Sequence, residues 1–170
     1  MLNKKQISAL IENKKLIENF IALDKQLTPN GFDLTAGGIF VFEGSGALDF
    51  SNSQRVVPAA KELKPMKDSV TDSYGWWELP KGAYKVKTNE TVNLPNDLTA
   101  LAFTRTSLLR MGAFTQHGVW DAGFRGKGEF ILIVENGAGV RIKENARLAQ
   151  LVFFPVEETQ GYSGVYKGLV

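Results

Sequence analysis

Side chains able to bind a phosphate group lie close together in the stretch FTRTSLLRMG (103–112). Arg105, Thr106, Ser107 and Arg110 stand within six consecutive positions. If a helical turn begins at Thr106 or Ser107, free backbone N–H groups, hydroxyls and guanidinium groups point toward one place, and that combination suits a phosphate. The alternative is an ordinary capped helix whose arginines face solvent.

A carboxylate has a distinctive setting in GVWDAGFRGK (118–127). Asp121 follows a tryptophan and precedes Ala-Gly, so the sequence gives it the surroundings for partial desolvation. Such a carboxylate can orient or deprotonate a water molecule, or it can simply form the turn of a hairpin. Asp33 in PNGFDLTAG (29–37) offers a similar choice, because an aspartate after an Asn-Gly turn commonly forms an Asx-turn. His117, the sole histidine, is more often a hydrogen-bonded structural ring than a base.

Composition removes several classes of chemistry. The chain has no cysteine and one histidine, which excludes disulfides, thiolate zinc sites, a thiol nucleophile and a multi-histidine metal site. Any metal is then a hard cation on oxygen ligands that arrives with phosphates. The net charge is +2 and the 20 basic residues are scattered, which favours one small polyanion over nucleic acid. No apolar run approaches the ~20 residues that span a bilayer, and no signal peptide is evident. We therefore expect a cytoplasmic protein that binds neither nucleic acid nor membrane.

Hydrophobic patterning predicts an all-β fold. A short amphipathic helix is expected at residues 3–13. After it, short β-branched or aromatic runs alternate with Gly, Asn and Pro turns, which is typical of a β-sandwich or barrel with one helical decoration. The expected strands occupy residues 37–44, 83–95, 98–105, 129–137, 139–143 and 148–156.

The length of 170 residues suits one domain spanning residues 1–170. Residues 44–73 are polar and mixed, and we expect a long excursion, either a surface loop or a mobile flap. The aromatic cluster YGWWELPKG (74–82) is expected to pack in the core or between subunits, with a platform for a nucleobase as the lesser alternative. Residues 157–170 form a C-terminal tail.

Four stretches, taken in chain order, resemble the motifs of one known family. NGFDLT (30–35), RTSLLRMG (105–112), GVWDAGFRG (118–126) and ARLAQLVF (146–153) are similar to the ordered motifs of the dUTPase and dCTP deaminase superfamily, most closely its archaeal and viral dUTPases. The resemblance implies a distorted β jelly roll, the dUTPase-like β-clip fold, in a homotrimer whose active sites are shared between subunits. It also implies a dUTP diphosphatase that uses Mg²⁺ to hydrolyse dUTP to dUMP and pyrophosphate.

The resemblance assigns catalytic roles to three residues. Asp121 would activate the water that attacks the α-phosphorus. Asp33 would lie near the metal and the sugar, with its link to Mg²⁺ through water. Arg110 would reach a phosphate or brace Asp121 across the site.

The resemblance also implies a set of substrate-binding residues. The triphosphate would be cradled by one group of polar residues, the uracil read by a hairpin, the deoxyribose stacked on an aromatic ring that excludes a 2′-hydroxyl, and the nucleotide capped by the tail. The cradle residues are Arg105, Thr106 and Ser107, and the hairpin residues are Gln116, His117, Gly118 and Val119. The stacking ring is Phe124. The capping residue of the tail is Tyr162, Tyr166 or Lys167, and Gln150 also lies beside the nucleotide.

Deaminases of this superfamily carry a glutamate on the strand after the third motif, where it shuttles a proton at the base. Depending on the direction of counting, Ile131 or Ile133 stands at that place here, and isoleucine cannot move a proton. Residues 129, 131, 133 and 135 share one face of a strand, so a slip of the register through Gly128 would bring Glu129 or Glu135 into the site. The prediction is therefore dUTP hydrolysis, with dCTP deamination or a bifunctional enzyme as the alternative.

Two other features bear on the activity. The tail GYSGVYKGLV (161–170) is closer to the deaminase type than to the Gly-rich, Arg-containing arm of typical trimeric dUTPases, and it does not decide between the two reactions. A non-enzymatic nucleotide sensor on the same fold is the remaining alternative. Retention of Asp33 and Asp121 together with Arg105 and Arg110 favours the enzyme, since a sensor would be free to lose one of them.

Overall fold

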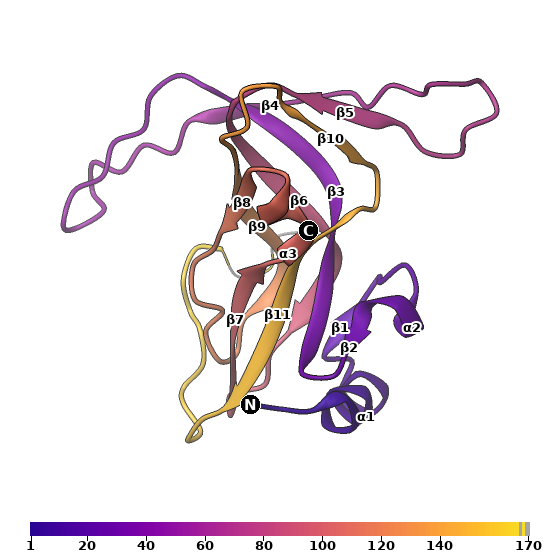
Figure 1. Cartoon of the computed structure of the whole chain (residues 1–170). Helices are drawn as coiled ribbons and strands as arrows, with labels where there is room; N and C mark the ends of the chain where they lie inside the picture. The colour runs from indigo at the N-terminus through magenta and orange to yellow at the C-terminus, as the bar shows by residue number, and fades with distance from the viewer. Residues whose placement is uncertain (167, 169–170) are drawn as a thin grey trace.

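The computed structural model describes residues 1–166 and residue 168, and strands dominate it (Figure 1). Three short helices accompany them: α1 (Lys4–Lys14), α2 (Leu23–Gln26) and α3 (Thr106–Arg110). The strands, in chain order, are β1 (Ile17–Glu18), β2 (Leu27–Thr28), β3 (Gly31–Glu43), β4 (Ala59–Glu62), β5 (Trp76–Leu79), β6 (Gly82–Asn93), β7 (Leu98–Thr104), β8 (Ala113–Gln116), β9 (Arg125–Val134), β10 (Val140–Lys143) and β11 (Arg147–Pro155).

One large antiparallel sheet contains nine of these strands. Its order is β7-β11-β3-β6-β9-β8, with β1 paired to β6, and β2 and β4 paired to β3. The two ends of this path meet, because the Thr104 hydroxyl lies 3.0 Å from the Thr115 carbonyl oxygen and accepts a 2.9 Å hydrogen bond from the Thr115 N–H. The sheet is thus nearly closed, and the predicted all-β, dUTPase-like fold is confirmed.

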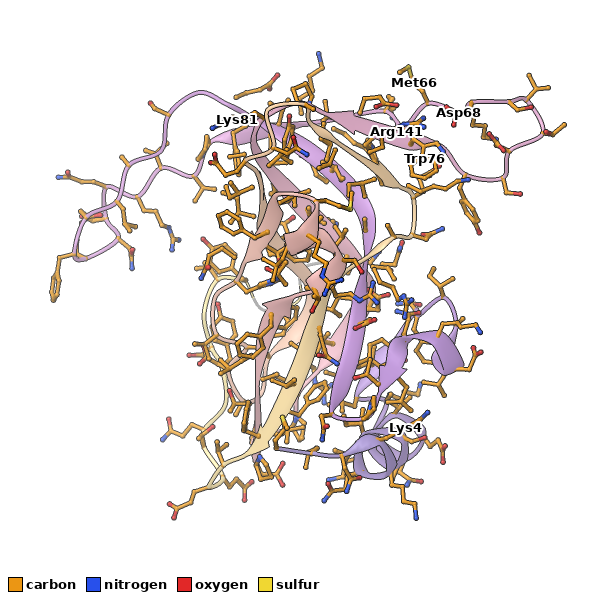
Figure 2. The ribbon with its side chains drawn as sticks, viewed as in Figure 1. Lys4, Met66, Asp68, Trp76, Lys81 and Arg141 are labelled. Atoms are coloured by element: carbon orange, nitrogen blue, oxygen red, sulfur yellow. The ribbon has the colours of Figure 1, made fainter. Side chains whose placement is uncertain are left out.

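The remaining pair, β5 and β10, forms a separate two-stranded sheet at the end of the molecule opposite α1 (Figures 1 and 2). The guanidinium group of Arg141 lies over the ring of Trp76 of β5, with its Cζ 4.7 Å from the ring centroid. Arg141 in turn pairs with Asp68 at 2.7 Å and with Glu78 at 2.6 Å. Trp77, the next residue, is buried in a hydrophobic core cluster shared with the large sheet, whereas Tyr74 is exposed. The predicted core packing of the aromatic cluster therefore holds for Trp77.

Helix α1 begins and ends as its sequence dictates. Asn3 caps the N-terminus through a reciprocal capping box with Gln6, which satisfies two backbone N–H groups. Ile7 and Ile11, four residues apart, bury one face of the helix against the large sheet. The predicted N-terminal helix is confirmed, and within the described residues no helix is long and apolar enough to cross a membrane.

The strand boundaries differ from the predictions where burial hides the alternation of side chains. Strand β3 begins at Gly31 rather than at residue 37, because residues 31–36 are all buried and show no period of two. Asp33 therefore lies inside a strand and forms no Asx-turn. Strands β1 and β2, of two residues each, and strands β4, β5 and β8, of four residues each, were not predicted. Strand β10 has the same length of four residues and was predicted. The 44–73 excursion contains β4, and its two loops project on opposite sides of the molecule (Figure 1).

A buried polar cluster joins β3, β6 and α2. The Glu90 side chain is fully buried and accepts hydrogen bonds from the Thr35 N–H at 2.9 Å, the Thr35 hydroxyl at 2.5 Å and the Gln26 amide at 2.7 Å. The same Gln26 amide donates to the Asp33 carbonyl at 2.9 Å. Desolvation raises the pKa of Glu90, although the hydrogen bonds from Thr35 and Gln26 oppose that shift.

The pKa of Glu90 predicts how its contribution to stability depends on pH. Because the folded-state pKa is raised, the contribution is full below the unfolded value of about 4.3 and is lost as pH rises through the folded value. Glu90→Gln removes this dependence and leaves one accepted bond unmade, which costs about 1–3 kcal/mol. We expect the stability deficit of the variant, measured by urea unfolding, to be largest near pH 4 and to shrink toward pH 8.

Glu135→Gln is the matched control, since Glu135 is exposed and pairs with Lys81 at the surface. Its stability difference from wild type should stay small at every pH. A deficit of Glu90→Gln that does not change with pH would contradict the raised pKa.

Candidate active site

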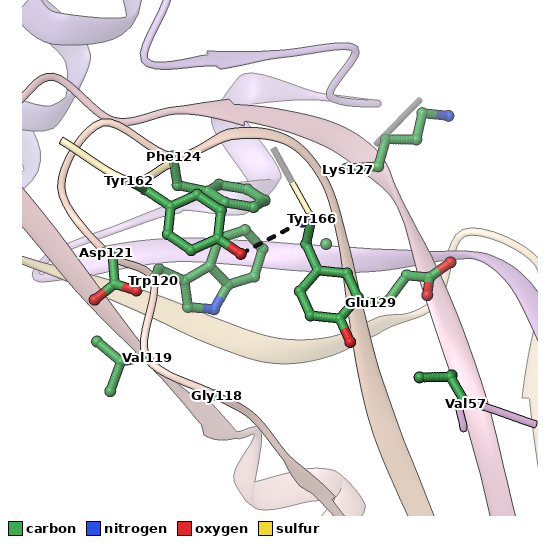
Figure 3. Close-up of a pocket in the computed structure, with 11 residues that line it drawn as sticks. Val57, Gly118, Val119, Trp120, Asp121, Phe124, Lys127, Glu129, Tyr162 and Tyr166 are labelled. Carbon is green, nitrogen blue, oxygen red and sulfur yellow. Dashed lines mark hydrogen bonds between the residues drawn. The ribbon is translucent and has the colours of Figure 1, made fainter. Parts of the chain in front are cut away.

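A cavity of about 390 Å³ opens beside the third of the quoted stretches (Figure 3). Its walls come from the loop before β9, the first half of β9, the C-terminal tail and the 44–73 excursion. The lining residues are Val57, Gly118, Val119, Trp120, Asp121, Phe124, Lys127, Gly128, Glu129, Tyr162 and Tyr166.

The loop that carries Asp121 is held at both ends by backbone hydrogen bonds. Trp120 and Ala100 of β7 exchange two bonds of 3.0 Å, and the Phe124 N–H donates to the Asp121 carbonyl at 3.1 Å. Gly123 takes a φ of +79° inside this turn, a conformation that favours glycine. Asp121 thus forms a turn through its backbone, while its carboxylate is exposed and makes no hydrogen bond or ion pair with any described residue.

Aromatic rings form the wall next to Asp121. Trp120 and Phe124 meet edge to face with centroids 5.3 Å apart, and Tyr162 lies 5.9 Å from Phe124 (Figure 3). Trp120 lies directly against Gly128, where an added Cβ would be 2.3 Å from its ring. Tyr162 is held in turn by a 2.7 Å hydrogen bond from its N–H to the Ala122 carbonyl. Phe124 is half-buried and so offers part of its surface to the cavity.

A second polar group surrounds Asp33. Its side chain is 3% exposed, and its Oδ2 contacts Nε of Arg105 at 2.9 Å and Nη1 of Arg147 at 3.2 Å. Desolvation raises the pKa of Asp33, with the charges of Arg105 and Arg147 acting in the opposite direction. Thr106 and Ser107 follow as the exposed first residues of α3, so the predicted helical turn is present. Gln150 lies directly across from Asp33 on β11.

The structure divides the predicted site residues into two groups. Gly118, Val119, Asp121, Phe124, Tyr162 and Tyr166 line the cavity; Asp33, Arg105, Thr106, Ser107 and Gln150 form the second group. Trp120 pairs with one edge of β7. The other edge of β7 pairs with β11, and β11 pairs in turn with β3, the strand that carries Asp33. None of the described residues that line the cavity belongs to the second group. Arg110 and Gln116 are exposed and lie outside the cavity lining, and Lys167 lies outside the described residues.

Sequence reasoning missed three contributors. Arg147 stands inside the fourth stretch, but the sequence gives no sign that it faces Asp33. Val57 enters the cavity from the excursion, and Lys127 enters from β9. Of the two glutamates considered for a slipped register, Glu129 lines the cavity with both oxygens near Lys85 Nζ, at 3.2 and 3.3 Å, whereas Glu135 does not line it. Ile131 pairs with Gln116 and Lys85 in the regular register of β9.

His117 is held among neighbours of β8 and β9. Its Nε2 lies 2.8 Å from the Thr115 hydroxyl, and its ring centroid lies 4.4 Å from that of Phe130. Nδ1 is buried and has no hydrogen-bond partner among the described residues. Desolvation lowers the pKa of His117 to about 4. These contacts favour the structural role for this ring.

The acidic and histidine side chains determine whether the chain itself can hold a metal ion. Within residues 1–166 and 168, no group of three or more His, Cys, Asp or Glu side chains is placed to hold an ion. A hard cation would therefore take most of its ligands from phosphates and water, which fits an ion carried in by a nucleotide.

Comparisons with known proteins identify the family of this chain. Residues 1–156 match the family model described as dCTP deaminase-like. A protein from Methanosarcina mazei, named probable deoxyuridine 5′-triphosphate nucleotidohydrolase, is 46% identical over 170 residues, with 98% of this chain and 96% of the relative covered. A Persephonella marina protein named dCTP deaminase, dUMP-forming, is 33% identical over 174 residues, covering 99% and 92%. The crystal structure of a 2′-deoxycytidine 5′-triphosphate deaminase from Agrobacterium tumefaciens superposes with a TM-score of 0.61 at 20% identity, over 89% of this chain and 47% of that chain.

The lowered pKa of His117 can be tested directly by NMR, because no other histidine contributes imidazole signals to the spectrum. We expect its imidazole NMR signals to titrate with a midpoint near pH 4, since desolvation lowers its pKa to about that value. Because the folded-state pKa is depressed, the stability it contributes above about pH 6.5 is lost as pH falls toward 4. His117→Asn removes the signals and confirms their origin. A midpoint near the ordinary value of 6.5 would show that the ring is solvated.

Proposed function

Because the chain belongs to the dCTP deaminase-like family, we propose that it is a dUTP diphosphatase, which converts dUTP and water to dUMP and pyrophosphate. The observation that carries the proposal is the cavity, which is lined both by Asp121, with its free carboxylate, and by the half-buried ring of Phe124. The name of the Methanosarcina mazei relative, which matches over almost the whole chain, supports the same reaction.

Asp121 acts as the general base. Its carboxylate has no partner within the described part of the chain, so it is free to accept a proton from a water molecule. The water oxygen attacks the α-phosphorus, the bond from that phosphorus to the bridging oxygen breaks, and pyrophosphate leaves with the electron pair. Phe124 stacks on the deoxyribose, and Gly118 and Val119 present backbone groups to the uracil, while Gln116 and His117 precede them outside the cavity lining.

The second group supplies the phosphate cradle. Arg105, Thr106 and Ser107 offer a guanidinium group, hydroxyls and backbone N–H groups to the triphosphate. Mg²⁺ bound with the phosphates would neutralise charge on the leaving pyrophosphate. Arg110 and Gln150 lie near this cradle in sequence and register, and Tyr162 and Tyr166 cover the cavity side of the nucleotide.

The separation of the two groups supports a shared site. One nucleotide needs the base at its α-phosphorus and the cradle at the same triphosphate. Within one chain, β7 and β11 stand between the cavity and Asp33. We therefore propose a homotrimer in which the cavity of one chain faces the cradle of its neighbour.

Two observations favour dCTP deamination as a second candidate. Glu129 lines the cavity, and the Persephonella marina relative carries a deaminase name. Against it, both Glu129 oxygens lie near the Lys85 ammonium. In addition, Ile131, at the place where deaminases of this superfamily carry the glutamate, pairs with Lys85 in a regular register. A nucleotide sensor on this fold would have no need of an unpaired carboxylate at the sugar-binding wall.

The reaction is tested by product analysis with Mg²⁺ and dUTP, dCTP or UTP. We expect dUMP and pyrophosphate from dUTP, and no uracil nucleotide from dCTP. Asp121→Asn should lower kcat about a hundredfold or more while nucleotide binding remains, because the amide cannot accept the proton. Asp72→Asn is the control, since Asp72 is a half-buried carboxylate of the excursion that does not line the cavity and accepts a hydrogen bond from the Ser69 N–H. Release of dUTP or dUMP from dCTP would overturn the monofunctional assignment, and full activity of Asp121→Asn would remove its role.

The shared site is tested by mixing two inactive variants. Asp121→Asn spoils the cavity of its own chain, and Arg105→Ala spoils the cradle. If sites form between chains, a mixed oligomer contains some sites with Asp121 from one chain and Arg105 from the other. Co-expression should therefore restore part of the dUTPase activity that neither variant has alone. Sites built within a single chain would give no restoration, because every site would carry one substitution.

A further inference from the structure

We propose that Asp33 is a positioning residue that aims two guanidinium groups at the phosphates, and that Arg147 is the second arginine of this subsite. The inference rests on the proposed function for the identity of the phosphates. It assigns a role to a residue of the fourth stretch that has none so far, and it gives Asp33 work that does not require a metal.

The three side chains form one compact unit. Oδ2 of Asp33 lies 2.9 Å from Nε of Arg105 and 3.2 Å from Nη1 of Arg147, so both arginines share a single oxygen. The Asp33 side chain is 3% exposed, against 27% for Arg105 and 37% for Arg147. The anion is therefore inside and the two cations lie toward solvent. Two positive charges against one leave a surplus of positive charge on the exposed side.

Backbone oxygens fix the orientation of both guanidinium groups. Nη1 of Arg147 also donates to the Lys25 carbonyl at 2.6 Å, and Nη1 of Arg105 donates to the Arg147 carbonyl at 3.2 Å. A guanidinium group carries five N–H donors. Arg147 uses two of them in hydrogen bonds, and Arg105 uses one, while its Nε contacts Asp33 as an ion pair. The remaining donors make no hydrogen bond with any described residue. They remain available to a polyanion.

Other polar groups lie near the free N–H donors of the two arginines. Arg105 is the N-cap residue of α3, directly before the exposed Thr106 and Ser107. Arg147 begins β11, where it lies across from Thr35. Two arginines and two hydroxyls thus meet at one corner of β3, β11 and α3. A triphosphate, with several charged oxygens, matches this arrangement better than a single carboxylate would.

The buried carboxylate explains why the arginines can stay together. Two guanidinium groups at one spot repel each other unless an anion lies between them. Without Asp33, the repulsion would drive at least one of them outward into solvent, and their remaining donors would no longer converge. This is a positioning effect, and it persists when no metal is present.

The test measures binding of inorganic tripolyphosphate to the full chain by calorimetry in EDTA. This probe has no base, no sugar and no bound metal, so the result does not depend on which nucleotide is hydrolysed. Arg147→Ala should weaken binding about ten- to a hundredfold, the worth of charge-assisted hydrogen bonds. Arg147→Lys keeps the charge without the planar fork and should fall between the variant and wild type.

Asp33→Asn separates positioning from charge. Removal of a negative charge alone would strengthen the binding of an anion, whereas loss of positioning weakens it. We expect weaker binding in EDTA. With dUTP and Mg²⁺, the same substitutions should raise KM more than they lower kcat, since the arginines hold substrate before and during the reaction.

Arg141→Ala is the matched control, because Arg141 also pairs with two carboxylates but lies in the small β5–β10 sheet (Figure 2). It should leave tripolyphosphate binding unchanged, and thermal unfolding should show that the Arg147 variants are folded. Unchanged binding by Arg147→Ala would overturn the role of Arg147. Binding by Asp33→Asn as tight as wild type, or tighter, would overturn the positioning role. Failure of dUTP hydrolysis with tripolyphosphate binding still lost in Arg147→Ala would reject the proposed reaction and keep the subsite.

Discussion

Strand β3 runs through the interior with six consecutive buried residues, and two of them are polar. A buried polar group is costly unless it is hydrogen bonded, and a buried charge must be paired. Asp33 is matched by two guanidinium groups, and Thr35 is matched by Glu90, which Gln26 also contacts. These partners come from α2, β6, β11 and the start of α3. Satisfying two side chains of one strand therefore fixes how four other elements meet it.

The same cluster reaches the cavity through β6. Its register is irregular between Lys87 and Thr91, where the Thr88 hydroxyl donates to the Glu90 carbonyl at 2.8 Å and accepts from the Gly128 N–H at 3.0 Å. Gly128 supports Trp120, the residue before the candidate base. Bulges of this kind often re-aim side chains next to active sites. One irregular stretch of β6 thus borders both the buried polar cluster and the wall of the cavity.

Much of this fold was predictable, and the failures have physical causes. Strand β6 was predicted within two residues at each end, because a half-buried strand shows a period of two in its sequence. Strand β9 also alternates, but it begins at Arg125, four residues before the predicted start at residue 129. The first half of β3 was not, since both of its faces are covered. In the site, the members of each local stretch were assigned from the resemblance of the four stretches to known motifs, since the local chemistry of each left alternatives open. The meeting of Arg147 with Asp33 was not, because it depends on the pairing of β11 with β3, far apart in the chain.

The division of the polar residues also limits what one chain can do. The cavity holds a carboxylate and aromatic rings, which suit a base and a sugar, while the surplus positive charge lies beyond β7 and β11. Under the proposed function, the two groups would hold the two ends of one deoxynucleoside triphosphate. In the proposed trimer, the cradle of one chain would present the phosphorus to Asp121 of its neighbour. The unpaired carboxylate would then meet the scissile bond only in an assembled site.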